Sequence, residues 1–177
     1  VLCPCDDRET KAFVKAALLD VNGPVYLRLG RSEVPDLFTD AEEFHIGKGN
    51  VIVDGTDAVI FSVGETVFRA VEAAKKLREE GISLAVVSLA SIKPIDSELI
   101  VKYAKKAGHV FTLEDHNIYG GLGSAVCEVL CRDYPAKLTM LGIRDEFGMS
   151  GSTEELAKIF ALDPDSIAGA VRNAVNA

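Results

Sequence analysis

The sequence lacks any apolar run that approaches the ~20 residues needed to cross a lipid bilayer. It also lacks an excess of positive charge, since its formal net charge is −8, and this argues against a general affinity for nucleic acid or anionic membranes. The opening residues, VLCPCDDRET, include neither Met nor the basic segment of a signal peptide. We therefore expect a cytoplasmic protein without membrane or nucleic-acid partners, and a portion of a longer parent chain.

Cysteine is scarce, with only Cys3, Cys5, Cys127 and Cys131 present. A zinc site built from all four is an alternative, but their spacings match no usual zinc-binding pattern. Cys127 and Cys131 are four residues apart and so share one helix face. We interpret the four as small hydrophobic residues in a reducing compartment.

From residue 58 onward, short apolar segments rich in β-branched residues alternate with amphipathic helical segments. This alternation is typical of parallel strands joined by right-handed crossovers. Upstream, NVIVDGTDAVIF predicts an antiparallel strand that turns at Asp54-Gly55. We predict an α/β fold, a three-layer αβα arrangement with a mostly parallel sheet and one antiparallel edge strand. The strands are expected at 58–63, 84–89, 109–113 and 138–142, and the helices at 65–80, 96–107, 122–132, 152–160 and from 164 onward.

Residues 1–35 do not belong to this repeat and predict a strand end, a helix (ETKAFVKAALLD) and a strand (GPVYLRLG). Such a remnant cannot bury both faces of its sheet alone. We interpret 1–35 as the tail of a preceding α/β domain, 36–47 as an irregular linker and 48–177 as the main domain. The tail is expected to be unstable, mobile or packed on something else.

The glycine turn in EDHNIYGGLGSAV raises the question of a ligand, because helix N-termini after such turns often hold anions. The pattern is GGLG rather than GxGxxG, and Glu114 and Asp115 already place negative charge near the helix start. We favour a packing role for Gly120, Gly121 and Gly123, with an anion-binding turn as the alternative.

Arg31 follows a strand end beside Gly30, at the carboxyl edge of a sheet, where a guanidinium can hold a phosphate by paired hydrogen bonds. A solvated or ion-paired arginine is the alternative for this position. Arg28 is expected within the strand. His116 is a candidate acid–base group because it adjoins Asp115, although no nucleophile stands beside it.

Five segments resemble the carboxyl-terminal part of transketolases in order and spacing, most closely the small split-type carboxyl-terminal subunit. They are GPVYLRLGR, IGKGNVIVDGTDAVIFSVG, VVSLASIKPID, TLEDHNIYGGLGSAVCEVL and IRDEFGMSG. Deoxyxylulose-phosphate synthase shares the same domain organisation. It usually has EEN where this chain has Glu114-Asp115-His116, and it tends to lack the segment DEFGMSG. The β subunits of 2-oxo-acid dehydrogenases are a more distant third.

The resemblance implies part of an enzyme that moves a two-carbon ketol unit between sugar phosphates with thiamine diphosphate and Mg. It implies that 1–35 is the end of the pyrimidine-binding domain and that 48–177 is the carboxyl-terminal domain. It implies partners, namely the remaining domains or an amino-terminal subunit, in a homodimer. This sequence has no GDG…N metal motif, so the portion is expected to bind no cofactor, to hold no metal or catalytic residue, and to be inactive alone.

One functional residue carries over from the resemblance. The arginine that ends an IRTSR-like strand contacts the substrate phosphate in transketolases, and that position falls on Arg31. This chain departs from the pattern in having Leu29-Gly30 where many relatives have Thr-Ser.

Overall fold

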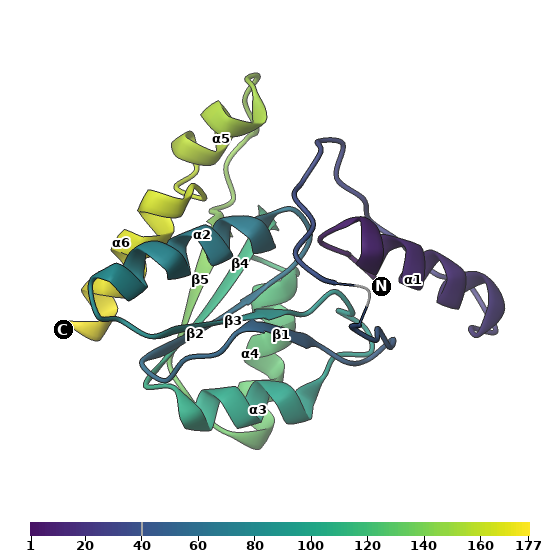
Figure 1. Ribbon diagram of the computed structural model, residues 1–177, viewed down its shortest axis with the longest axis horizontal. Coiled ribbons are helices and arrows are strands. Elements are labelled where there is room, and N and C mark those ends of the chain that lie inside the picture. Colours follow the sequence, from purple (N-terminus) through teal and green to yellow (C-terminus); the bar gives the residue numbers. More distant parts are fainter. Residues whose placement is uncertain (40) are drawn as a thin grey trace.

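The computed structural model describes residues 1–39 and 41–177 (Figure 1). Residue 40, within the predicted linker, lies outside the described residues. The helices are α1 (Asp7–Leu19), α2 (Thr66–Glu79), α3 (Ser97–Lys106), α4 (Leu122–Asp133), α5 (Thr153–Ile159) and α6 (Pro164–Val175), and the strands are β1 (Asn50–Val53), β2 (Ala58–Ser62), β3 (Leu84–Ser88), β4 (His109–Asn117) and β5 (Leu138–Ile143).

The strands form one sheet in the order β1-β3-β2-β4-β5. The pairs β2–β3, β2–β4 and β4–β5 are parallel, and β1 runs antiparallel to β3 at the edge. Every residue of β2 and β3 is buried, because helices cover both faces of a parallel sheet. The predicted fold class, with its single antiparallel edge strand, is therefore confirmed.

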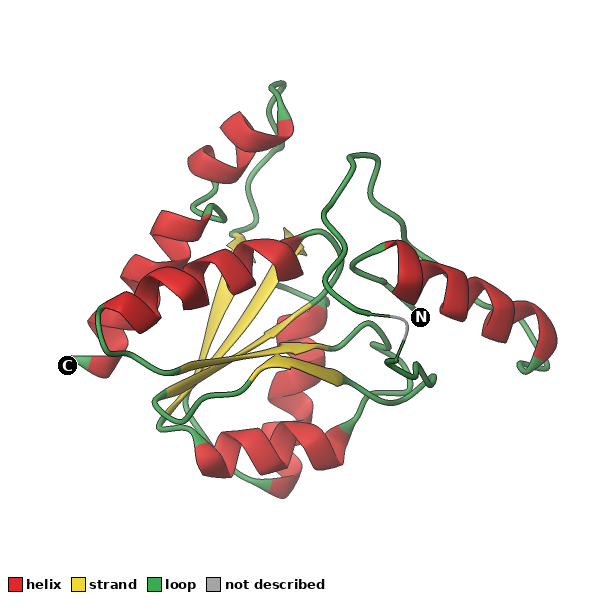
Figure 2. Cartoon of the chain, in the orientation of Figure 1, coloured by secondary structure: helices red, strands yellow, loops and turns green. Residues whose placement is uncertain are grey.

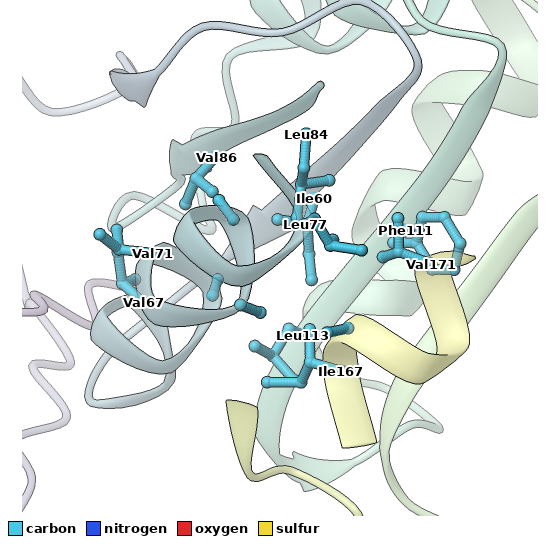
Figure 3. Packing of buried hydrophobic residues seen from close by; sticks show 14 of the residues in the cluster. Ile60, Val67, Val71, Leu77, Leu84, Val86, Phe111, Leu113, Ile167 and Val171 are labelled. Carbon is cyan, nitrogen blue, oxygen red and sulfur yellow. The ribbon is translucent and has the colours of Figure 1, made fainter. Parts of the chain in front are cut away.

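Helices α2 and α6 cover one face of the sheet, while α3 and α4 cover the other (Figure 1). On the α2 side, Ile60 and Val86 of the sheet meet Leu77 of α2 and Ile167 of α6 (Figure 3). The expected apolar stripe of α2 is buried in full, because its members repeat at helical spacing. That stripe consists of Val67, Val71, Ala74 and Leu77.

The antiparallel edge strand is correct, but its predicted partner is wrong. The chain does not form a hairpin at Asp54-Gly55. In the sheet, β3 lies between β1 and β2, so β1 pairs with β3 and not with β2. A Cβ on Gly55 would lie 2.5 Å from the backbone nitrogen of Ala85, and Asp57 accepts a 2.8 Å hydrogen bond from the Ser83 amide. Gly55 therefore serves a close backbone approach to β3 rather than a two-residue hairpin.

The predicted strand GPVYLRLG is also wrong as a regular strand. It forms one isolated parallel bridge, between Leu2 and Leu27, with hydrogen bonds from the Leu2 amide to Tyr26 and from the Arg28 amide to Leu2. The Cys3 amide bonds instead to Ala90. Residues 1–3 divide their backbone hydrogen bonds between two neighbours, so no ladder develops. The segment 24–30 is drawn as loop (Figure 2).

Strand β4 is longer than the predicted 109–113, because it continues through the polar residues 114–117. Its pairing with β5 shifts register between Leu113 and Asn117. In a sequence, polar residues usually indicate the end of a buried strand. Here the extension still pairs with β5, through Asn117 and Ile143, and the side chains of Glu114 and Asp115 accept hydrogen bonds.

Helix α1 projects from the side of the sheet near the N-terminus (Figure 1). Its inner side is fixed by Phe13, which is buried with Leu2 and Ala90. Its outer side leaves Leu18 77% and Leu19 71% exposed. Helix α1 is thus packed along one side only, whereas Cys3 and Cys5 before it are buried in the two core clusters of the sheet.

The predicted helix caps are confirmed where the structure describes them. Asp96 accepts a hydrogen bond from the Leu99 amide, Ser152 and Glu155 form a capping box, and Asp163 caps α6 ahead of Pro164. None of the described helices is long and apolar enough to cross a membrane.

Candidate functional site at the carboxyl edge of the sheet

The glycine turn before α4 is filled by a side chain of the protein itself. Glu114 is buried, and its two carboxylate oxygens accept hydrogen bonds of 2.7 Å from the amides of Leu122 and Gly123. Burial raises the pKa of Glu114, and these two amide bonds oppose that effect. The carboxylate occupies the N-terminal end of α4, where an anionic ligand would bind.

The glycines of this turn are needed for space. A Cβ on Gly121 would lie 2.0 Å from Glu114 Oε2, and one on Gly123 would lie 2.8 Å from Met140 Sδ. Gly120 has a φ of +76°, which a side chain would strain. The packing interpretation of the turn therefore agrees with the structure. The position that the anion-binding alternative requires is occupied by the Glu114 carboxylate.

Asp115 is held by Arg28 rather than by its neighbour His116. The Arg28 guanidinium donates to both Asp115 carboxylate oxygens, at 2.8 and 2.9 Å. These bonds to Asp115 raise the pKa of Arg28 above its ordinary value. The bidentate pair joins the 1–35 tail to the end of β4. The sequence alone does not reveal this pair, because the two residues are 87 positions apart.

His116 is exposed, and its Nδ1 lies 2.8 Å from the Asn117 carbonyl oxygen and 3.9 Å from Glu114 Oε2. The sequence-level candidate therefore lacks the carboxylate partner that its position next to Asp115 suggested. Its arrangement supplies no acid–base pair with Asp115.

Arg31 is exposed in the bend after the 24–30 segment. Across residues 1–39 and 41–177, no side chain or backbone group forms a hydrogen bond or ion pair with it. The ion-paired alternative is therefore not found among the described residues, and phosphate binding by Arg31 stays a prediction.

A cavity of about 380 Å³ lies between the start of α1 and the carboxyl edge of the sheet, and its lining does not include Arg31. Its lining includes Gly30 and Ser32, the neighbours of Arg31, together with Glu65. Burial raises the pKa of Glu65, and the nearby Asp115 charge adds to the effect. The remaining acidic lining residues are Asp6, Asp7 and Glu33.

A second cavity, of about 210 Å³, lies where α5 meets α2 at the same edge. Arg69 lines it, is almost fully buried, and donates to both carboxylate oxygens of Glu154 at 3.1 and 2.8 Å. This pair fixes α5 on α2. The sequence alone does not single out Arg69, because its partner Glu154 is 85 positions away.

The cysteines do not form the four-cysteine zinc site considered from sequence. Across residues 1–39 and 41–177, no cluster of three or more His, Cys, Asp or Glu residues could hold a metal ion. Cys3 and Cys5 are buried, whereas Cys127 and Cys131 lie on α4 and are accessible.

Comparisons with known proteins agree with this fold. Residues 47–167 match the family model for the transketolase C-terminal domain. The chain is 42% identical over 168 residues to an apulose-4-phosphate transketolase subunit of Phocaeicola vulgatus, a match that covers 94% of this chain and 53% of that protein. It is 37% identical over 176 residues to 1-deoxy-D-xylulose-5-phosphate synthase of Chlorobium luteolum, covering 97% of this chain and 28% of the synthase.

A solved structure described as split gene transketolase, inactive beta4 tetramer, superposes with a TM-score of 0.93 at 43% identity. The match covers 99% of this chain and 57% of that one. Fold and comparisons together define a domain of the transketolase type. The chain belongs to the transketolase C-terminal domain family, and it spans about half the length of the curated transketolase relative it matches, at 53%.

Proposed function

We propose that this chain is the carboxyl-terminal portion of a transketolase, an enzyme that transfers a two-carbon ketol unit between sugar phosphates with thiamine diphosphate. The observation that carries the proposal is the family match over residues 47–167, supported by the 42% identity to the apulose-4-phosphate transketolase relative. A cytoplasmic location goes with this proposal.

The residues of the described chain do not fit the cofactor or its metal. They offer no cluster of three or more His, Cys, Asp or Glu residues that could hold Mg²⁺, and the helix end best placed for a diphosphate is occupied by Glu114. We therefore assign thiamine diphosphate and Mg to the remaining domains or to an amino-terminal subunit. This chain contributes no catalytic residue, and alone it is inactive.

In this proposal Arg31 binds the phosphate of the sugar substrate. Support comes from its exposure, its freedom from partners within residues 1–39 and 41–177, and its place after Gly30, which lies against Glu65 at the carboxyl edge of the sheet. That edge is where ligands bind in open α/β folds. A guanidinium and a phosphate form paired, charge-assisted hydrogen bonds.

The proposal also assigns residues 1–35 to the end of a pyrimidine-binding domain, 36–47 to a linker and 48–177 to the carboxyl-terminal domain. The exposed outer side of α1, with Leu18 and Leu19, then packs on the rest of the pyrimidine-binding domain. The complete enzyme is proposed to be a homodimer. The related split gene transketolase is described as an inactive beta4 tetramer, and this supports inactivity of a carboxyl-terminal part on its own.

The test of this function is complementation. The isolated chain, supplied with thiamine diphosphate and Mg²⁺, is expected to give no ketol transfer between sugar phosphates. The complete enzyme, assembled from the whole parent sequence or with the amino-terminal subunit, is expected to turn over. Turnover by the isolated chain well above background would contradict the proposal.

Arg31 is tested in the complete enzyme. Arg31→Ala is expected to lower kcat/KM for a phosphorylated sugar by about 10- to 100-fold, the equivalent of the roughly 1.5–3 kcal/mol that a hydrogen bond to a charged group contributes. Arg31→Lys keeps the charge but loses the paired geometry, and an intermediate value is expected. With an unphosphorylated sugar the variants and the parent enzyme should coincide; an equal loss on both sugars would rule out phosphate binding.

A second candidate is a fragment of deoxyxylulose-phosphate synthase, because a relative of that name is 37% identical over 97% of this chain. Product analysis of the complete enzyme separates the two. Formation of 1-deoxy-D-xylulose 5-phosphate, without ketol transfer between sugar phosphates, would favour the synthase. The small-anion regulatory module is disfavoured, since Glu114 fills the site it requires.

A further inference from the structure

Two accessible thiols lie side by side on α4, away from the carboxyl edge. Cys127 and Cys131 are four residues apart in the helix, so that their side chains lie on the same face one turn apart. Their sulfur atoms are 3.8 Å apart. Cys131 is exposed and Cys127 is partly so, and helix α4 belongs to the layer that covers one face of the sheet (Figure 1).

The other two cysteines differ from this pair in being buried. Cys3 and Cys5 are each 3% exposed, and burial raises the pKa of Cys3 to about 11. Thiols in such surroundings are closed to solvent and inert. Cys127 and Cys131 are therefore the accessible cysteine pair among residues 1–39 and 41–177.

The spacing of the two sulfur atoms matches one edge of a tetrahedral thiolate site. With a zinc–sulfur bond of about 2.3 Å and tetrahedral angles, two coordinated sulfurs lie about 3.8 Å apart. The distance observed between Cys127 Sγ and Cys131 Sγ is 3.8 Å. A cation could thus bind both sulfurs without a change in the helix backbone.

We propose that Cys127 and Cys131 form a bidentate site for a thiophilic divalent cation of the zinc and cadmium class. Each thiol gives up its proton as its sulfur–metal bond forms, so that two protons are released for each cation bound. Because no cluster of three or more His, Cys, Asp or Glu residues exists in the described chain, the other two coordination positions belong to water or added ligands. The site therefore binds exchangeably, and it is independent of the proposed transketolase activity.

Cadmium(II) is the probe, because cadmium–thiolate charge transfer gives an ultraviolet absorption that zinc lacks. The full chain is kept reduced with a phosphine, so that no disulfide forms and no competing thiol is added. Titration with Cd²⁺ is expected to develop this absorption, and Zn²⁺ is expected to remove it by competition. Cys127→Ser and Cys131→Ser should each weaken Cd²⁺ binding by at least about 100-fold, since loss of even an outer-shell partner costs 10–100-fold in metal affinity.

Glu79→Gln is the control, because this exposed carboxylate lies on α2, on the opposite face of the sheet from α4. It should bind Cd²⁺ like the parent chain. Circular dichroism checks that each serine variant keeps its helices, as an accessible Cys→Ser change should allow. The site would be overturned by the absence of charge-transfer absorption from the reduced chain, or by its persistence in the double serine variant. Loss in only one of the two single variants would mean binding by a lone thiol and would equally overturn the bidentate site.

Discussion

At the scale of the residue, Glu114 shows how a carboxylate of the chain can take the position of a bound anion. Its buried carboxylate oxygens accept hydrogen bonds from the first free amides of α4, and Gly121, which has no side chain, leaves room for this carboxylate. The charge near the helix start was predictable, because Glu114 and Asp115 directly precede the turn. Which of the two acids would enter it was not, since that depends on the distant partner Arg28.

Replacement of Gly121 by alanine tests this packing. Its Cβ would lie 2.0 Å from Glu114 Oε2, so Gly121→Ala is expected to lower the free energy of unfolding by about 1–3 kcal/mol, the usual cost of overpacking. Denaturant unfolding measures the change.

Gly169→Ala in α6 is the matched control, because no neighbour lies within 4 Å of its added Cβ. It should leave stability unchanged or raise it by up to about 1 kcal/mol through helix propensity. Equal effects of the two substitutions would contradict the role given to Gly121.

At the scale of the element, α1 is anchored by two buried carboxylates. Asp6 caps the helix and accepts hydrogen bonds from the amides of Leu37 and Phe38. Glu9 accepts a 2.8 Å bond from the Cys5 amide and a 3.2 Å bond from the Ser88 hydroxyl of β3. The tail thereby acquires a fixed position on the sheet.

Glu9 makes this anchoring depend on pH. Burial raises the pKa of Glu9 from 4.5 to about 7 in the folded chain, so the folded state binds the proton more tightly than the unfolded state. The stabilisation is complete below pH 4.5 and is lost as pH rises to about 7. The loss is on the order of 3 kcal/mol, at about 1.36 kcal/mol for each unit of pKa shift.

Glu9→Gln removes this titration. The variant should be as stable as the parent near pH 4.5 and more stable at pH 8, as measured by denaturant unfolding across that range. Glu128→Gln, an exposed change of the same kind, should follow the parent at each pH. Parallel curves for Glu9→Gln and the parent would show that Glu9 does not titrate in this range.

Prediction from sequence succeeded where an element depends on its own residues. The apolar stripe of α2 and the caps at Asp96, Ser152 and Asp163 follow from local patterns, and the structure confirms them. It failed where pairing is non-local. Strand β1 pairs with β3 rather than with β2. The segment 24–30 forms no ladder, because residues 1–3 beside it divide their backbone hydrogen bonds between two neighbours.

At the scale of the whole molecule, the tail meets the sheet through backbone hydrogen bonds of residues 1–3, through Glu9, and through the Arg28–Asp115 pair. The pair is partly exposed, with side chains 35% and 23% accessible. Its position at the end of β4 sets the tail beside the cavity at the carboxyl edge.

Arg28→Ala is therefore expected to loosen the tail more than it destabilises the main domain. Limited proteolysis should cut faster within residues 20–36, while global unfolding shifts by about 1 kcal/mol or less, as for partly exposed ion pairs. Arg28→Lys should restore little protection, because an ammonium cannot pair with both carboxylate oxygens.

The double variant Arg28→Ala/Asp115→Ala isolates the coupling of the pair. If the two residues act together, cleavage of the double variant should match that of either single variant. Independent, additive increases in cleavage would show that the pair does not hold the tail.

The carboxylate at the start of α4 also has a bearing on how the molecule responds to its medium. A counter-ion built into the chain cannot dissociate on dilution, and a buried one is screened little by dissolved salt. This helix end should accordingly be indifferent to the choice of buffer, with inorganic phosphate and chloride leaving it equally well ordered.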